Sequence, residues 1–208
     1  MTAATAFWTA PRGAEAQAWC DRYWDSWDAP YRAVADGLIA SLGDAPGVIL
    51  EVGCHCGPNL RRWLMADPPL ARAVIGLEAN ADAAAAGRHR LAALGLASRA
   101  RLLHGIFPIA TRGWLAGVAD IAVTSYALAY VEPAALAPAI AELTRLARRA
   151  VIMVEPMGTG QALSPGWRHD YAAATRMAVR GRRWWHYAVD PPAEGMDGAL
   201  VIGPPSAR

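Results

Sequence analysis

The stretch VILEVGCHCGPN, residues 48–59, sets the fold of this chain. It begins with apolar residues, which are typical of a strand that is buried on both faces. Gly53 and Gly57 follow, and Pro58 then stands where the first position of a helix is expected. A strand that leads through a glycine turn into a helix predicts a place where a ligand approaches the backbone closely.

The rest of the chain repeats this alternation of strand and helix. Besides the strand at 48–52 before the glycine turn, we expect strands at 73–79, 101–104, 120–125 and 150–155. Helices are expected at 58–66, directly after the turn, and at 81–94 and 133–147. Strands that alternate with helices indicate a mostly parallel, doubly wound sheet.

The C-terminal part departs from that alternation. A short helix is expected over 169–178, and strands are expected over 184–189 and 199–202. Because no helix separates these two strands, they predict an antiparallel hairpin at the end of the sheet. The stretch 180–187 mixes arginines with aromatic residues; we interpret the aromatics as strand packing and the arginines as solvated.

The N-terminal part is rich in aromatic residues. Trp19, Tyr23 and Trp27 follow one another at intervals of four, which places them on one face of a helix that we expect to pack on the sheet. A second helix is expected over 31–42. Residues 1–45 are therefore predicted to form a helical cap or lid.

The length of 208 residues suits one structural domain, so residues 46–208 are expected to form the ligand-binding domain beneath that cap. Tyr31 and Arg32, near the start of the second helix, are the residues that we expect to act as a lid over a ligand.

Composition excludes several classes of partner. The formal net charge is +2, which is too small to favour a polyanion, so no nucleic acid is expected. No apolar run approaches the roughly 18 residues of a membrane span, and residues 1–10 lack the pattern of a signal peptide. We therefore expect a cytoplasmic protein with no membrane partner. The chain has no lysine, which excludes Schiff-base chemistry and a phosphate-binding P-loop.

The three cysteines are Cys20, Cys54 and Cys56. An odd, small number argues against a disulfide framework. Cys54, His55 and Cys56 together suggest a metal site, but no second Cys/His cluster stands at metal-ligand spacing in the sequence. The sequence therefore predicts no metal site.

Two classes of cofactor are candidates for binding at the glycine turn. A dinucleotide site requires the spacing G-x-G-x-x-G, whereas this turn reads G-x-x-x-G with His55 in its middle. Glu51 stands at the end of the strand, where a carboxylate would repel a pyrophosphate. S-adenosylmethionine (SAM) carries a sulfonium, an ammonium and no phosphate, so an acidic residue there favours it.

The segment from Glu51 to Asn59 resembles the first motif of the class I SAM-dependent methyltransferases. The resemblance extends over about residues 46–203 and implies a doubly wound, three-layer Rossmann-like methyltransferase fold. Its seven-stranded sheet would be mostly parallel, with one antiparallel strand from the C-terminal hairpin.

The resemblance also implies the residues that hold the cofactor. Glu78 ends the second expected strand, where an acid of this family binds ribose hydroxyls. The family often places an acid near the adenine amine, but this chain has Gly105 and Ile106, so backbone groups and Phe107 would hold the adenine instead. The complete expected cofactor set is Glu51, Gly53, Cys54, His55, Gly57, Asn59, Glu78, Ala79, Gly105, Ile106, Phe107 and Ser125.

Three residues are candidates for catalysis. Tyr126 follows the fourth expected strand, an end that faces the methyl group in this family. Glu155 ends the fifth strand, and His169 opens the following helix; either is a candidate base. A base is needed only if the acceptor loses its proton early.

The resemblance implies transfer of a methyl group to oxygen or nitrogen of a small molecule, such as a secondary metabolite or a sugar. The segment 124–130 lacks the Asn/Asp-Pro-Pro-Tyr pattern of the enzymes that methylate amino groups of DNA bases. An RNA or protein methyltransferase and a non-catalytic SAM-binding protein stay open as alternatives, and the oligomeric state is not predicted.

Overall fold

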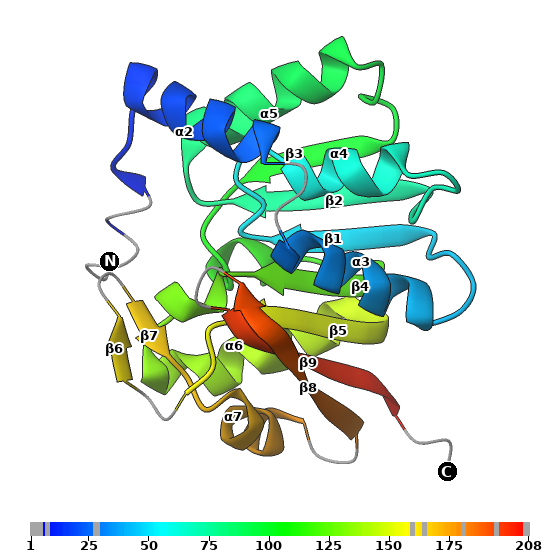
Figure 1. The fold of residues 1–208 in the computed structure, drawn as a ribbon, viewed down its shortest axis with the longest axis vertical. Helices are drawn as coiled ribbons and strands as arrows, with labels where there is room; N and C mark the ends of the chain where they lie inside the picture. Colours follow the sequence, from blue (N-terminus) through cyan, green and yellow to red (C-terminus); the bar gives the residue numbers. More distant parts are fainter. Residues whose placement is uncertain are drawn as a thin grey trace.

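The computed structural model describes residues 6, 9–26, 30–158, 161–163, 166–179, 182–193 and 196–205. A seven-stranded sheet forms its centre, in the order β3-β2-β1-β4-β5-β9-β8 (Figure 1). The strands are β1 (Val48–Val52), β2 (Ala73–Glu78), β3 (Ala100–His104), β4 (Ala119–Ser125), β5 (Ala147–Glu155), β8 (Arg182–Ala193) and β9 (Met196–Pro205).

The direction of the strands follows the expected pattern. The five strands β1 to β5 are parallel to one another, while β9 runs antiparallel to both β5 and β8. One strand of the seven is therefore reversed, and the prediction of a mostly parallel sheet with a C-terminal hairpin is confirmed. The hairpin strands are longer than expected, since β8 and β9 extend beyond 184–189 and 199–202 at both ends.

Helices cover both faces of the sheet, so the fold has three layers. One face carries α3 (Pro30–Ser41), α4 (Pro58–Met65) and α5 (Ala81–Ala93), and the other carries α6 (Pro133–Leu146) and α7 (Tyr171–Ala178) (Figure 1). Among the described residues, no helix combines the length and the apolar character that crossing a bilayer requires.

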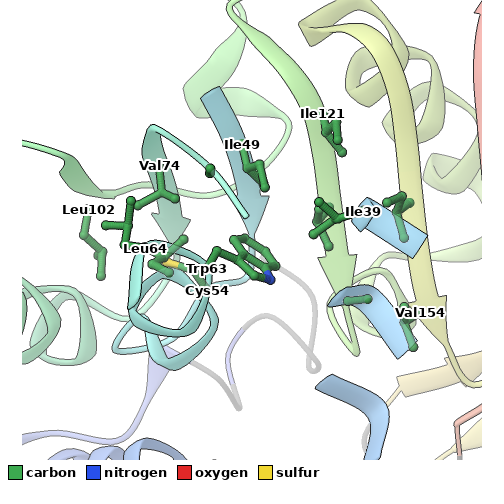
Figure 2. Close-up of a cluster of buried hydrophobic side chains, with 14 of the residues drawn as sticks. Ile39, Ile49, Cys54, Trp63, Leu64, Val74, Leu102, Ile121 and Val154 are labelled. Atoms are coloured by element: carbon green, nitrogen blue, oxygen red, sulfur yellow. The ribbon is translucent and has the colours of Figure 1, made fainter. Parts of the chain in front are cut away.

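The core on the α3–α4–α5 face is built around Trp63, which is fully buried (Figure 2). Its indole Nε1 donates a hydrogen bond to Asp36 Oδ1 of α3 at 2.9 Å, which satisfies the polar atom of the buried ring. Cys54 lies in the same apolar cluster, although it belongs to the glycine turn. The turn is therefore anchored in the core by one of its own side chains.

Short polar side chains start two of the helices. Asn80 accepts hydrogen bonds from the backbone N–H groups of Asp82 and Ala83, both at 3.0 Å, at the start of α5. Asp170 accepts one from Ala173 N at 2.8 Å at the start of α7. Such caps satisfy backbone donors that lack a partner within the helix.

The N-terminal helix α2 (Gly13–Asp25) packs differently from the expectation. It lies on α5 and α4 rather than on the sheet (Figure 1), and its buried residues are Ala16 and Cys20. Trp19 and Tyr23 are half-buried. The prediction that these aromatics pack on the sheet is wrong, because the helices of the first two crossovers already cover that part of the sheet. Trp27 lies outside the described residues.

The structure also contains elements that were not expected. A two-stranded sheet joins β6 (Gln161–Leu163) to β7 (Gly166–Arg168), and short 3-10 helices form at Ile109–Thr111 (η1) and Leu128–Tyr130 (η2). Three residues are too few to show a periodic pattern.

In β8, Trp184 packs against the core, whereas Trp185 and Tyr187 are exposed, so the expectation of strand packing holds for Trp184 and is wrong for the other two. Arg180 and Gly181 lie outside the described residues.

A pair of leucines tests the layer of α6 on the sheet. Leu143 is fully buried, whereas Leu115 is 81% exposed. We expect Leu143→Ala to lower the free energy of unfolding by about 2–5 kcal/mol, because it removes buried methyl groups and leaves a cavity. Leu115→Ala, the same change at the surface, should alter it by less than about 0.5 kcal/mol. Urea denaturation measures both, and equal effects would contradict the layer arrangement.

Candidate functional site

A cavity of about 420 Å³ lies at the carboxyl ends of β1, β2 and β4. In an open, doubly wound sheet this is the edge where ligands bind. Its lining consists of Tyr23, Arg32, Glu51, Val52, Gly53, Cys54, His55, Pro58, Asn59, Leu77, Glu78, Ala79, Gly105, Ile106, Phe107, Ser125, Tyr126, Ala127, Leu128, Tyr130 and Val131.

The glycine turn forms one wall of this cavity with an unusual backbone. Gly53, His55 and Gly57 all have positive φ angles, of 76°, 51° and 81°. A Cβ atom on Gly53 would lie 2.5 Å from Ala127 Cβ, so this position tolerates only glycine. Gly57 does not line the cavity; its N–H donates to Cys54 O at 2.8 Å and closes the turn.

Glu51 is buried at the base of the cavity with one oxygen free of protein partners. Asn59 donates from Nδ2 to Glu51 Oε1, and Arg32 donates from Nη1 to Asn59 Oδ1. Glu51 Oε2 is buried and has no hydrogen-bond partner. Burial raises the pKa of this carboxyl to about 7. A buried acceptor without a donor, beside a cavity, is suited to a ligand that carries a donor or a positive charge.

Glu78 joins the glycine turn to the end of β2. Its Oε2 accepts a hydrogen bond from His55 N at 2.8 Å, and its Oε1 accepts one from Asn80 N at 2.8 Å. Burial raises the pKa of the Glu78 carboxyl, although these backbone donors oppose the shift. The carboxylate therefore lies at the cavity with its position fixed by two backbone N–H groups.

His55 lines the cavity and contacts α2. Its ring lies 4.9 Å from the ring of Tyr23, measured between centroids. Burial, with Arg32 and Arg90 nearby, lowers the pKa of the imidazole to about 4. The ring is therefore neutral at physiological pH, and its buried Nδ1 has no hydrogen-bond partner.

The wall after β3 is formed by Gly105, Ile106 and Phe107, three residues that the sequence placed near an adenine. A Cβ atom on Gly105 would lie 2.6 Å from Ala110 Cβ, so the backbone here is also closely packed. Among the described residues that line this wall none is acidic, so the wall presents backbone groups and apolar surface to the cavity.

Tyrosines form the wall after β4. Tyr126 has a positive φ of 56°, and its ring centroid lies 5.9 Å from that of Tyr130. Burial, together with the nearby Glu155, raises the pKa of Tyr126, so its hydroxyl stays protonated at neutral pH. The wall after β4 therefore offers aromatic surface together with a neutral phenol.

Glu155 and His169 do not line the cavity. Both side chains form hydrogen bonds to the backbone of the loop 127–131. Glu155 Oε1 accepts hydrogen bonds from Ala127 N and Leu128 N at 3.0 and 3.1 Å. His169 donates from Nε2 to the carbonyl oxygen of Val131 at 3.0 Å. Both side chains are buried, so this geometry supports a positioning role, and their assignment as bases stays a prediction.

The structure thus brings eleven of the twelve expected cofactor residues to one cavity, together with Tyr126. Sequence reasoning missed Tyr130, Val131 and Tyr23 as parts of its lining. Tyr130 and Val131 lie in the loop after β4, at the end of the expected motif 124–130 and just beyond it. Only the fold shows that this loop turns back to line the cavity. Arg32, expected as a lid residue, lines the cavity; the side chain of Tyr31 lies outside the described residues.

The structure also brings together a cluster of cysteine and histidine side chains at the glycine turn that the spacing along the sequence does not reveal. The ligand-type atoms of Cys20, His55 and Cys56 all lie within 4.8 Å of one another. Cys20 comes from α2, far earlier in the chain. The sequence argument considered only spacing along the chain, where no second Cys/His cluster accompanies Cys54, His55 and Cys56, and it therefore missed Cys20. The expectation of no metal site stays a prediction.

Comparison with solved structures finds the same fold in several proteins, among them methyltransferases. DesVI from Streptomyces venezuelae is 16% identical, with a TM-score of 0.67 over 93% of this chain and 100% of that one. An O-methyltransferase family protein from Burkholderia thailandensis is 15% identical, with a TM-score of 0.67 over 98% of this chain. Magnesium protoporphyrin IX methyltransferase from Synechocystis PCC 6803, solved with bound SAM, is 16% identical, with a TM-score of 0.59 over 84% of this chain and 80% of that one.

These likenesses show that the chain has the fold of the class I SAM-dependent methyltransferases. No family model and no curated protein sequence matches it. The chain spans 64% of the length of the Burkholderia protein. The fold alone does not fix the reaction, since a structure described as a [4+2]-cyclase, SpnF, also matches, with a TM-score of 0.60 at 14% identity over 84% of this chain and 83% of that one.

The pKa of Glu51 gives a testable dependence of stability on pH. Its value of about 7 in the folded protein lies above the ordinary value of 4.5, so the folded protein keeps a proton that the unfolded chain releases between these pH values. Stability therefore falls as the pH rises through this window. We expect Glu51→Gln to reduce this loss in the free energy of unfolding by about 1–3 kcal/mol. Urea denaturation at about pH 5 and about pH 8 measures the loss in each protein.

Glu142→Gln is the matched control. Arg145 lowers the pKa of Glu142, so this carboxyl contributes stability that is present at high pH and lost on acidification. Its replacement should leave the fall between about pH 5 and about pH 8 in place. A Glu51→Gln variant with the same pH dependence as the wild type would show that Glu51 ionises normally.

Proposed function

We propose that this chain binds SAM in the cavity at the ends of β1, β2 and β4 and transfers its methyl group to a small-molecule acceptor. The observation that carries the proposal is the buried Glu51 Oε2, which has no protein partner and lies at the base of that cavity. A buried carboxylate oxygen without a donor is costly unless a ligand supplies one.

The charges of the cavity fit a cationic ligand better than a dinucleotide. Two buried carboxylates, Glu51 and Glu78, line it. Arg32 is the basic side chain among the described lining residues, and its guanidinium already donates to Asn59 Oδ1 and, from Nε, to Ser26 O at 2.9 Å. A pyrophosphate would face two negative charges, whereas a sulfonium and an ammonium gain from both.

The residues around the cavity would hold the cofactor without supplying reactive groups of their own. Gly53 allows its backbone to approach closely, Glu78 offers acceptors for ribose hydroxyls, and Phe107 offers apolar surface for the base. When bound, SAM supplies a methyl group on a positively charged sulfur. The contribution of this chain is then to position the acceptor and exclude water.

The tyrosine wall after β4 is the proposed acceptor side. Tyr126 keeps its proton at neutral pH, so it donates or accepts a hydrogen bond and orients an oxygen or nitrogen of the acceptor. Since Glu155 and His169 are hydrogen-bonded to the loop 127–131, neither of the two candidate bases faces the cavity. An acceptor nitrogen with a free lone pair suits this arrangement, because it needs no base before transfer.

The size and surroundings of the cavity favour a small acceptor over a polymer. About 420 Å³ is near the lower end of the range of small-molecule pockets, roughly 300–1,000 Å³, so the cofactor would fill much of it. A groove for RNA needs several cations along its edge, whereas the described lining holds one arginine that is already hydrogen-bonded. The helices of residues 1–45 act in this proposal as a cap, through Tyr23 and Arg32.

A second candidate is a protein that binds SAM without transferring its methyl group. The positions of Glu155 and His169 favour it, because both potential bases have structural partners. The two candidates differ in one experiment. Purified protein is titrated with SAM by calorimetry and then incubated with methyl-labelled SAM and separate metabolite, RNA and protein fractions.

We expect binding of SAM and label in the metabolite fraction. Label in RNA or protein alone would replace the small-molecule acceptor with a polymer. Binding without transfer to any fraction would favour the non-catalytic candidate, and an absence of SAM binding would overturn the whole proposal.

Gly53→Ala tests the glycine wall. Its added Cβ would meet Ala127 at 2.5 Å, so we expect the loss of measurable SAM binding in a folded protein. Gly95→Ala is the matched control: Gly95 has a similar φ of 73°, but nothing lies within 4 Å of an added Cβ. Both variants carry the same backbone strain, so normal SAM affinity in a folded Gly53→Ala variant would refute the assignment of this wall.

Glu78→Gln tests the second carboxylate. We expect it to weaken SAM binding by about 1–3 kcal/mol, the range for a lost hydrogen bond to a charged group. Exposed Glu132, just beyond the cavity loop, provides the comparison, since Glu132→Gln changes the net charge equally. If calorimetry gave the same affinity for both variants, long-range charge rather than direct contact would explain the effect.

A further inference from the structure

Cys20, His55 and Cys56 form a cluster between α2 and the glycine turn. Their ligand-type atoms lie within 4.8 Å of one another. Both cysteines are fully buried, and Cys56 Sγ lies 3.5 Å from the carbonyl oxygen of Cys20. Cys54, the remaining cysteine of the chain, belongs instead to the apolar core with Trp63 (Figure 2).

We propose that Cys20, His55 and Cys56 bind a zinc ion that fastens α2 to the glycine turn. Two thiolates and an imidazole are the ligands that Zn²⁺ prefers over harder cations. A tetrahedral Zn²⁺ with Zn–S of about 2.3 Å and Zn–N of about 2.1 Å spaces its ligand atoms about 3.6–3.8 Å apart. The observed separations, at most 4.8 Å, exceed this spacing by no more than about 1 Å, which small side-chain rotations would close.

A zinc ion explains the histidine as well as the cysteines. His55 Nδ1 is buried without a hydrogen-bond partner, and a ring nitrogen of His55 lies within 4.8 Å of both sulfurs. A disulfide between Cys20 and Cys56 would occupy both sulfurs and leave this nitrogen without a partner. Coordination instead satisfies all three side chains at once, and the cavity that His55 lines gives the ion a path of entry.

The surroundings of the cluster suit a neutral zinc–dithiolate centre. Zn²⁺ and two thiolates add no net charge to the buried region. Arg90 donates from Nη1 to the carbonyl oxygen of Cys20 at 3.3 Å, and Glu78 holds the backbone N–H of His55 at 2.8 Å. These groups fix the elements that carry the ligands, as outer partners of a metal site do. Three protein ligands leave the fourth position to water or a small ligand.

The test uses full-length protein without a histidine tag, kept reduced, stripped of metal and titrated with Zn²⁺ against a chromophoric chelator. We expect one Zn²⁺ per chain. We also expect a thiolate-to-metal charge-transfer band when Co²⁺ replaces Zn²⁺. Binding of less than one ion per chain by folded wild-type protein would overturn the proposal, independently of any variant.

Variants then identify the ligands. Cys20→Ser and Cys56→Ser should each weaken Zn²⁺ binding by more than the roughly 10–100-fold that loss of an outer partner costs. Cys54→Ser, the same change in the same turn, should keep the wild-type stoichiometry. Circular dichroism checks the fold of each variant. Wild-type Zn²⁺ affinity in folded Cys20→Ser, or a Cys20–Cys56 disulfide in the isolated protein, would contradict the zinc site.

Discussion

The close contact between Gly53 and Ala127 is the constraint on which the cavity depends. It brings the turn after β1 against the loop after β4, and an added Cβ would leave only 2.5 Å between the two residues. The loop is held in that place by Glu155, whose carboxylate accepts backbone hydrogen bonds from Ala127 and Leu128. These buried hydrogen bonds therefore shape one wall of the cavity. A residue with an ionisable side chain close to an active site does not have to act on the substrate to be necessary for it.

Buried carboxylates give this cavity its negative charge at a cost in stability. Glu51 is buried with an oxygen that has no partner, and its pKa of about 7 shows how strongly burial opposes its charge. A folded chain keeps such a group when a ligand compensates for it. Glu78 differs, because two backbone N–H groups already stabilise its carboxylate. The two acids at the cavity thus differ in what they require from a ligand, although the sequence shows both simply as glutamates at strand ends.

Much of the fold could be predicted because buried parallel strands and glycine turns leave local patterns in the sequence. The turn at Gly53 and the acid at Glu78 belong to such patterns, and both line the cavity. The direction in which a side chain points is not local. Glu155 and His169 stand at the expected places in the chain, but they face the loop rather than the cavity. Cys20 shows the same limit, since only the packing of α2 brings it to Cys56.

The contacts of α2 attach it to α5 at both ends. Pro11, just before α2, accepts a hydrogen bond from Asn80 Nδ2 at 3.0 Å, and Gly13 N donates to Asp82 Oδ2 at 2.9 Å. Near the other end of the helix, Arg90 reaches the carbonyl oxygen of Cys20. These attachments all lead to α5 or its cap, so α2 is fastened to α5 rather than to the sheet. Because Tyr23 extends from α2 to the ring of His55, this attachment also places an aromatic side chain of the N-terminal part at the wall formed by the glycine turn.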